Sequence, residues 1–225
     1  MPSVAEFIGD YDDPRSIGSS LRRRRSKPLL GLIERTYAER GGCSILDLGG
    51  TEKYWNSVSD LFLRQRNCRI TLLNHAAPQP RNTDLFTAAA GDGCAVDASD
   101  NSFDIVHSNS VVEHVGDWKR TQAFGGEVRR LARRYFVQTP NFWFPWEPHF
   151  GAPFFQFLPL PMRARLLMRR NRGFFRRCES AALAVEAVES IRLLDAFMMR
   201  ALFPDARLVR ERIFGLTKSL IAVRE

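Results

Sequence analysis

The chain has 225 residues, of which 44% are hydrophobic and 26% charged, and its net charge is +8. This is ordinary for a globular chain that can bury a sizeable core. No apolar run approaches the ~20 residues of a membrane span and no secretory signal is visible, so we expect a cytoplasmic protein. The four cysteines are scattered without a CxxC pair, which favours reduced thiols over a disulfide or zinc site.

Hydrophobic periodicity predicts strands alternating with helices along most of the chain. Roughly the first 20 residues are predicted to be a poorly structured leader. The predicted helices cover 21–39, 52–64, 121–134 and 181–202. The predicted strands lie within 43–51, 69–74, 86–90, 103–108, 134–138, 208–214 and 219–223. This order predicts an α/β fold with a Rossmann-like seven-stranded, mostly parallel sheet, an antiparallel C-terminal hairpin and helices on both faces.

A proline-rich and aromatic-rich stretch interrupts this alternation at about 141–178. The density of prolines predicts loops or short helices there. We therefore divide the chain into an N-terminal helical cap over 1–40 and a main domain over 41–225 that carries this insert. The aromatic residues either form a small core under a lid or line an acceptor site.

Basic residues gather in two clusters, at 22–27 and at 163–177. Such clusters are either solvated helix faces or contacts for phosphate groups of lipid, sugar nucleotide or RNA. The second cluster directly follows the aromatic stretch, which favours an anionic acceptor or an approach to an anionic membrane surface.

Small and polar residues follow several predicted strands at the point where each strand ends. They are Asp47 with Gly49 and Gly50, then Asn74, Asp92 with Gly93, and Ser108. A parallel sheet brings its strand ends together along one edge, where ligands bind at the topological switch point. The pattern therefore predicts a pocket for a nucleotide-like ligand.

Two segments carry a family resemblance, Ile45 to Thr51 and Phe103 to Val115. Together they resemble the class I S-adenosylmethionine-dependent methyltransferases, most closely the small-molecule branch (methyltransferase type 11-like) that includes ubiquinone-pathway O-methyltransferases. The likeness covers about residues 40–140, and the terminal hairpin agrees with it.

This resemblance implies that S-adenosyl-L-methionine is the cofactor and that the strand-end residues bind it. Asp47 and Gly49, with Gly50 beside them, match the turn that holds the methionine part. Asn74 stands where the family usually has an acid for the ribose hydroxyls. Asp92 and Gly93 match the turn that recognises adenine, and Ser108 lines the end of the fourth strand.

The chain departs from the family pattern at two places where the family binds its cofactor, the glycine loop and the ribose position. Thr51 and Lys53 replace later glycines, and the amide of Asn74 lacks the charge that strengthens a bond to a hydroxyl. The competing interpretation, a dinucleotide-binding dehydrogenase, requires a GxGxxG spacing that this loop does not have.

Methyl transfer to a hydroxyl benefits from a base, and histidine suits that role near neutral pH. The candidates are His114, next to Glu113, and His149 in the Glu-Pro-His sequence of the insert. Some relatives bind a divalent metal through Glu-x-x-Glu-His and a later histidine. Here Ser110 replaces the first glutamate, so we expect no metal.

We therefore expect methyl transfer from S-adenosylmethionine to a small-molecule, glycan or lipid-linked acceptor, at oxygen. Two alternatives stay open, an RNA methyltransferase and a cofactor-binding protein without catalysis. The net charge favours RNA, whereas the chain shows no appended RNA-binding module and no Asn-Pro-Pro-Tyr after the fourth strand.

Overall fold

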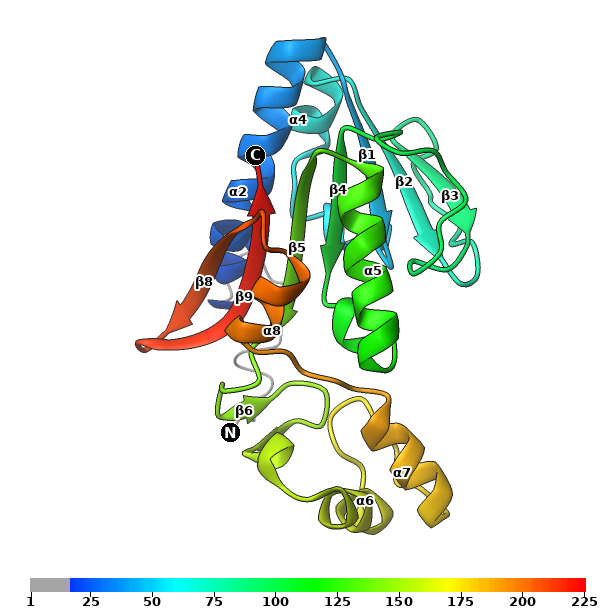
Figure 1. The fold of residues 1–225 in the computed structure, drawn as a ribbon, viewed down its shortest axis with the longest axis vertical. Helices are drawn as coiled ribbons and strands as arrows, with labels where there is room; N and C mark the ends of the chain where they lie inside the picture. Colours follow the sequence, from blue (N-terminus) through cyan, green and yellow to red (C-terminus); the bar gives the residue numbers. More distant parts are fainter. Residues whose placement is uncertain (1–16) are drawn as a thin grey trace.

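The computed structural model describes residues 17–225, so most of the predicted leader lies outside the described residues. Within this range, seven strands form one sheet in the order β3-β2-β1-β4-β5-β9-β8 (Figure 1). The strands are β1 (Cys43–Leu48), β2 (Cys68–Asn74), β3 (Phe86–Ala90), β4 (Ile105–Asn109), β5 (Arg134–Pro140), β8 (Arg207–Ile213) and β9 (Leu216–Arg224).

The first five of these strands run parallel, and the hairpin β8–β9 closes the sheet by antiparallel pairing of β9 with β5. The strand order changes direction between β1 and β4, so their carboxyl ends form the topological switch point. The predicted mostly parallel seven-stranded sheet with an antiparallel C-terminal hairpin is confirmed.

Helices cover both faces of the sheet, because alternate strand residues point to opposite sides. Phe136 joins the core beneath α2 (Ile17–Arg40), α3 (Glu52–Trp55) and α4 (Asp60–Gln65). Its neighbours Tyr135 and Val137 join the core on the other face, beneath α5 (Trp118–Leu131) and α8 (Ala196–Leu202). The buried strands therefore hold both layers together, as continuous apolar runs predict.

The prediction of one continuous helix over 52–64 is wrong, because the structure has two short helices there. Residues 56–59 separate α3 from α4. The hydroxyl of Ser59 accepts a hydrogen bond from the Phe62 amide at 3.5 Å and caps α4. Serine at that position competes with helix continuation by capping a new helix start.

The helix predicted over 181–202 is also divided, into α7 (Ala181–Glu189) and α8. Between them, Leu194 forms a parallel bridge with Asn141, and the Asp195 carboxylate accepts from the Met198 amide at 2.9 Å to cap α8. The bridge joins residues more than 50 positions apart, so local periodicity could not predict the break.

The insert forms a separate layer at one end of the sheet (Figure 1). It contains the two-stranded hairpin β6 (Trp146–Glu147) and β7 (Ala152–Pro153), the 3-10 turn η2 (Phe155–Phe157) and α6 (Leu160–Arg169), and α7 packs against α6. Its own core consists of Phe150, Ala152, Phe155, Ala164, Leu167, Ala184 and Val188. Of the two interpretations of the aromatic stretch, the small core is therefore present and includes Phe150 and Phe155. None of the helices in the described part of the chain is long and apolar enough to span a membrane.

Candidate functional site

A cavity of about 310 Å³ lies at the carboxyl ends of the parallel strands. Four predicted cofactor residues line it together, Gly49, Asn74, Asp92 and Gly93. They come from the ends of three different strands, as the topological switch point requires. Sequence reasoning assigned no role to several other residues that line it: Leu48, Leu73, His75, Gly91, Ser110, Val111, Val115, Arg120 and Phe124.

The glycine turn after β1 tolerates no side chain at either position. Gly49 has a φ of +70°, and a Cβ there would lie 2.6 Å from a methyl group of Val111. A Cβ on Gly50 would lie 1.8 Å from the Asp47 carboxylate. Both glycines are therefore needed for the turn to pack against its own strand and the next one.

Asp47 lies beneath this turn and is fully buried. One carboxylate oxygen accepts from Trp55 Nε1 at 2.7 Å, and the other lies 2.6 Å from His107 Nδ1. Ser108 is buried as well, and its hydroxyl donates to the Leu48 carbonyl at 3.1 Å. Both residues thus support the loop from below, and their contact with the cofactor stays a prediction.

A second cavity of about 210 Å³ adjoins the first at Gly49 and is also lined by Asp47 and Gly50. Basic side chains of Arg25 and Lys53 line this second cavity. The two spaces therefore lie on either side of the glycine turn.

Asn74 and Asp92 are held in place by neighbouring groups. The Asn74 amide donates to the Gly50 carbonyl at 2.8 Å. Asp92 accepts from the Cys94 amide at 2.9 Å and, through both oxygens, from Arg120 at 2.9 Å. These hydrogen bonds lower the pKa of the Asp92 carboxyl, so it is ionised at neutral pH. Arg120 is a wall residue that no sequence motif indicated.

The two candidate bases meet beside the first cavity. The rings of His114 and His149 are edge to face with centroids 4.9 Å apart, although 35 positions separate them in sequence. His114 lies in η1 (Val112–His114) and lines the cavity, whereas His149 is buried in the insert. The fold thus brings both predicted residues together.

Two buried carboxylates complete this cluster. The sequence pointed to Glu113 only through the incomplete metal motif, and it gave Glu147 no role. Glu147 lies 2.7 Å from His149 Nδ1 and also accepts from the Phe150 amide at 2.6 Å. Glu113 accepts from the Thr139 hydroxyl at 2.9 Å, and its other oxygen lies 3.9 Å from His149 Nε2. Both acids stand within two residues of a candidate histidine, a signal that was available in the sequence.

Burial sets the protonation of this cluster. Desolvation raises the pKa of Glu113 to about 7, against the opposing effect of His149 and the Thr139 bond. Partial desolvation and the neighbouring His149 lower the pKa of His114 to about 4, so this imidazole is neutral at pH 7. Polar groups are thus held in a low-dielectric site next to the first cavity, an arrangement common at functional sites.

The same residues offer a set of possible metal ligands. One ligand atom each of Glu113, His114 and His149 lies within 4.8 Å of the others. Glu113 Oε1 is buried and has no hydrogen-bond partner among the described residues. A bound cation, or a proton on this oxygen, would satisfy it. Ser110, at φ +55°, supplies no carboxylate to this set.

No protein-family model and no curated protein matches this sequence. Solved structures match in fold. A "possible exported protein" of Bordetella parapertussis is 14% identical over 88% of this chain and 68% of its own, with a TM-score of 0.50. A 1,6-didemethyltoxoflavin-N1-methyltransferase of Burkholderia thailandensis, bound to S-adenosylhomocysteine, is 14% identical over 98% of this chain and 86% of its own, with a TM-score of 0.45.

A Galdieria sulphuraria structure assigned as a sarcosine dimethylglycine methyltransferase is 20% identical, with a TM-score of 0.36. The match covers 50% of this chain, which spans only 45% of that protein. Identities this low show the fold alone. The chain has the Rossmann-like fold of class I methyltransferases, with the strand order given above.

Proposed function

We propose that this protein transfers a methyl group from S-adenosyl-L-methionine to an oxygen of a small-molecule, glycan or lipid-linked acceptor. The observation that carries the proposal is the histidine–carboxylate cluster, which is buried apart from His114 and borders the strand-end cavity through that exposed residue. The cavity takes the cofactor, and the cluster stands where an acceptor hydroxyl loses its proton.

His149 is the proposed base. Its Nδ1 faces the Glu147 carboxylate, so the neutral ring carries its proton on Nδ1 and has a free lone pair on Nε2. The acceptor oxygen attacks the sulfonium methyl group, the carbon–sulfur bond breaks, and S-adenosylhomocysteine leaves. The hydroxyl proton passes to His149 Nε2, and Glu147 stabilises the resulting imidazolium.

The cofactor contacts follow from the two cavities. Asn74 would hold the ribose hydroxyls and Asp92 the adenine amino group, and both line the first cavity. Gly49 and Gly50 would hold the methionine part, and Asp47 holds this turn from beneath. Displacement at an activated methyl group mainly needs alignment and exclusion of water.

Calorimetric titration with S-adenosylmethionine tests the proposal, and saturable binding is the expected result. Asp92→Ala removes the proposed adenine contact and frees Arg120, so we expect affinity to fall about tenfold or more. Asp97→Ala is the matched control, because Asp97 is exposed nearby and does not line the cavity. Wild-type protein that binds no cofactor would refute the function, and an unchanged Asp92→Ala affinity would refute the adenine assignment.

The proposal includes a contact with an anionic membrane surface, through five exposed arginines of the insert. They make no ion pair among the described residues: Arg165, Arg169, Arg170, Arg176 and Arg177. Phe174 among them is 81% exposed. Cations interspersed with an exposed aromatic ring are typical of interfacial binding. A cytoplasmic location stays a prediction.

Sedimentation with phosphatidylserine vesicles checks this contact. We expect the protein to bind these vesicles and not vesicles of phosphatidylcholine. The double variant Arg169→Glu with Arg170→Glu should bind them at least tenfold more weakly, since each cation contributes about 1 kcal/mol. The control is the double variant Arg81→Glu with Arg133→Glu, which makes the same change of charge at two exposed arginines of the sheet domain. An equal loss of vesicle binding in both double variants, or displacement of the vesicles by RNA, would contradict a membrane-binding patch.

A further inference from the structure

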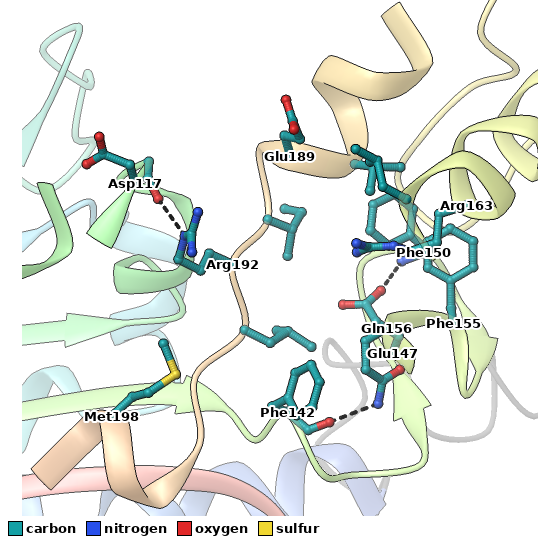
Figure 2. Close-up of a pocket in the computed structure, with 15 residues that line it drawn as sticks. Asp117, Phe142, Glu147, Phe150, Phe155, Gln156, Arg163, Glu189, Arg192 and Met198 are labelled. Carbon is teal, nitrogen blue, oxygen red and sulfur yellow. Dashed lines mark hydrogen bonds between the residues drawn. The ribbon is translucent and has the colours of Figure 1, made fainter. Parts of the chain in front are cut away.

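A cavity of about 610 Å³ lies between the insert and the sheet domain (Figure 2). One wall comes from α6, η2 and the β6 strand, and the other from Gly116, Asp117 and the segment that leads into α8. Phenyl rings and aliphatic side chains alternate with charged groups along it. The cavity is large enough for a ring-sized ligand with polar substituents.

Arg163 is the unusual residue of this wall. It reaches from α6 toward the cavity and is half-buried, and its guanidinium makes no hydrogen bond or ion pair within the part of the chain that the structure describes (Figure 2). Its Nε atom is fully buried without a partner. Desolvation lowers the pKa of the guanidinium, although the Glu147 and Glu189 carboxylates oppose this effect. A half-buried guanidinium without a partner is costly, so a bound anion would stabilise it.

The acids near Arg163 do not neutralise it by direct contact. Glu147 is engaged with His149 Nδ1 and the Phe150 amide. Glu189 and Asp117 are exposed at the rim, and Asp117 caps α5. The forked end of Arg163 therefore keeps its capacity for bidentate binding of a carboxylate or phosphate.

The cavity borders the proposed catalytic cluster at Glu147. Glu147 lines the cavity and holds His149. Gly116 lines it too, and directly follows Val115, which lines the strand-end cavity. The two cavities therefore lie on either side of the histidine–carboxylate cluster.

Gln156 gives the same wall a fixed orientation. Its amide nitrogen donates to the Phe142 carbonyl at 3.0 Å (Figure 2). It also donates to the Phe144 carbonyl at 2.6 Å. The aromatic segment at the mouth is thereby tied to η2, so the wall opposite Arg192 is preformed. A preformed wall reduces the ordering cost of ligand binding.

We propose that this cavity is the acceptor site and that Arg163 selects acceptors with a carboxylate or phosphate group on a hydroxyl-bearing ring. That the bound molecule is a methyl acceptor rests on the proposed function, whereas the binding of an anion at Arg163 rests on the geometry of this cavity. Arg163 is thus a specificity-determining residue, and the hydroxyl of the same ligand is the group that faces His149.

Calorimetry on the full chain, saturated with S-adenosylhomocysteine, tests the site with two matched pairs of probes. They are 4-hydroxybenzoate against 4-hydroxybenzamide, and glucose 6-phosphate against glucose. We expect at least one anionic probe to bind about tenfold more tightly than its neutral partner, since a charged hydrogen bond replaces a neutral one. The pair that shows the preference distinguishes an aromatic acid from a sugar phosphate.

Arg163→Gln is expected to remove this preference, Arg163→Lys to retain part of it, and Arg165→Gln to leave it unchanged. Arg165 is the control because it is exposed on the same helix outside the cavity. Equal binding within both pairs, binding of no probe, or a preference that persists in Arg163→Gln would overturn the inference. Cofactor titration separates the two proposals: a wild-type anion preference without cofactor binding refutes the proposed function alone, and cofactor binding without the preference refutes this site alone.

Discussion

Replacing His149 with alanine is expected to lower the rate of methyl transfer by about 10²- to 10⁴-fold, the usual contribution of a general base. His149 is the buried imidazole whose Nδ1 is fixed by Glu147 and whose Nε2 faces the cluster. It does not line the strand-end cavity, so cofactor affinity should change less than twofold. Single-turnover transfer and cofactor calorimetry on the same preparation give both quantities.

Three controls distinguish a base from other roles of this residue. Glu147→Gln should cost less than His149→Ala, because Glu147 only orients and stabilises the ring. Added imidazole should restore part of the rate of His149→Ala. Dialysis against a chelator should leave wild-type transfer unchanged. Loss of activity on chelation that a divalent metal restores would contradict the base and assign His149 with Glu113 and His114 to a metal centre.

Replacing Asp47 with alanine is expected to lower the free energy of unfolding by about 3–5 kcal/mol, the cost of leaving the partners of a buried charge unpaired. Trp55 Nε1 and His107 Nδ1 both lose their acceptor, and His107 Nε2 already has no partner among the described residues. The glycine turn rests on this carboxylate, so cofactor affinity should fall as well. Urea unfolding measures the first effect and calorimetry the second.

Asp92→Ala is the natural comparison for this variant. Asp92 is partly exposed at the cavity wall, where its pair with Arg120 contributes at most about 1 kcal/mol to stability. It should therefore lose affinity while keeping its unfolding midpoint. If Asp47→Ala unfolds at the wild-type urea concentration, the network beneath the turn does not stabilise the fold as the contacts indicate.

Local sequence signals were sufficient for the sheet and for part of the strand-end cavity. The run from Ile45 to Leu48 is buried on both faces, as a continuous apolar strand predicts. Gly49, Asn74 and Asp92 each follow a strand, and parallel pairing carries them to one edge. Strand identity and direction therefore determine where these residues meet, and both can be read from periodicity and turn residues.

The direction of the Asp47 side chain was beyond such reasoning. An acid at a strand end reads the same whether it faces a ligand or the interior. Only the packing of Trp55 from α3 and His107 from β4 decides that it is buried. Those contacts depend on how two later elements pack, which local pattern does not specify.

By itself, the sequence determined the class of fold, the strand edge at which the cavity lies and the two histidines that deserve testing. The tertiary structure alone decided that these histidines meet, that Glu113 and Glu147 are buried against His149, and that Arg163 lines a cavity beside them. The physical reason is range. Periodicity reports which face of an element is apolar, whereas this site is formed by contacts between a strand end and an insert some 35 residues later, whose position depends on the packing of its own core.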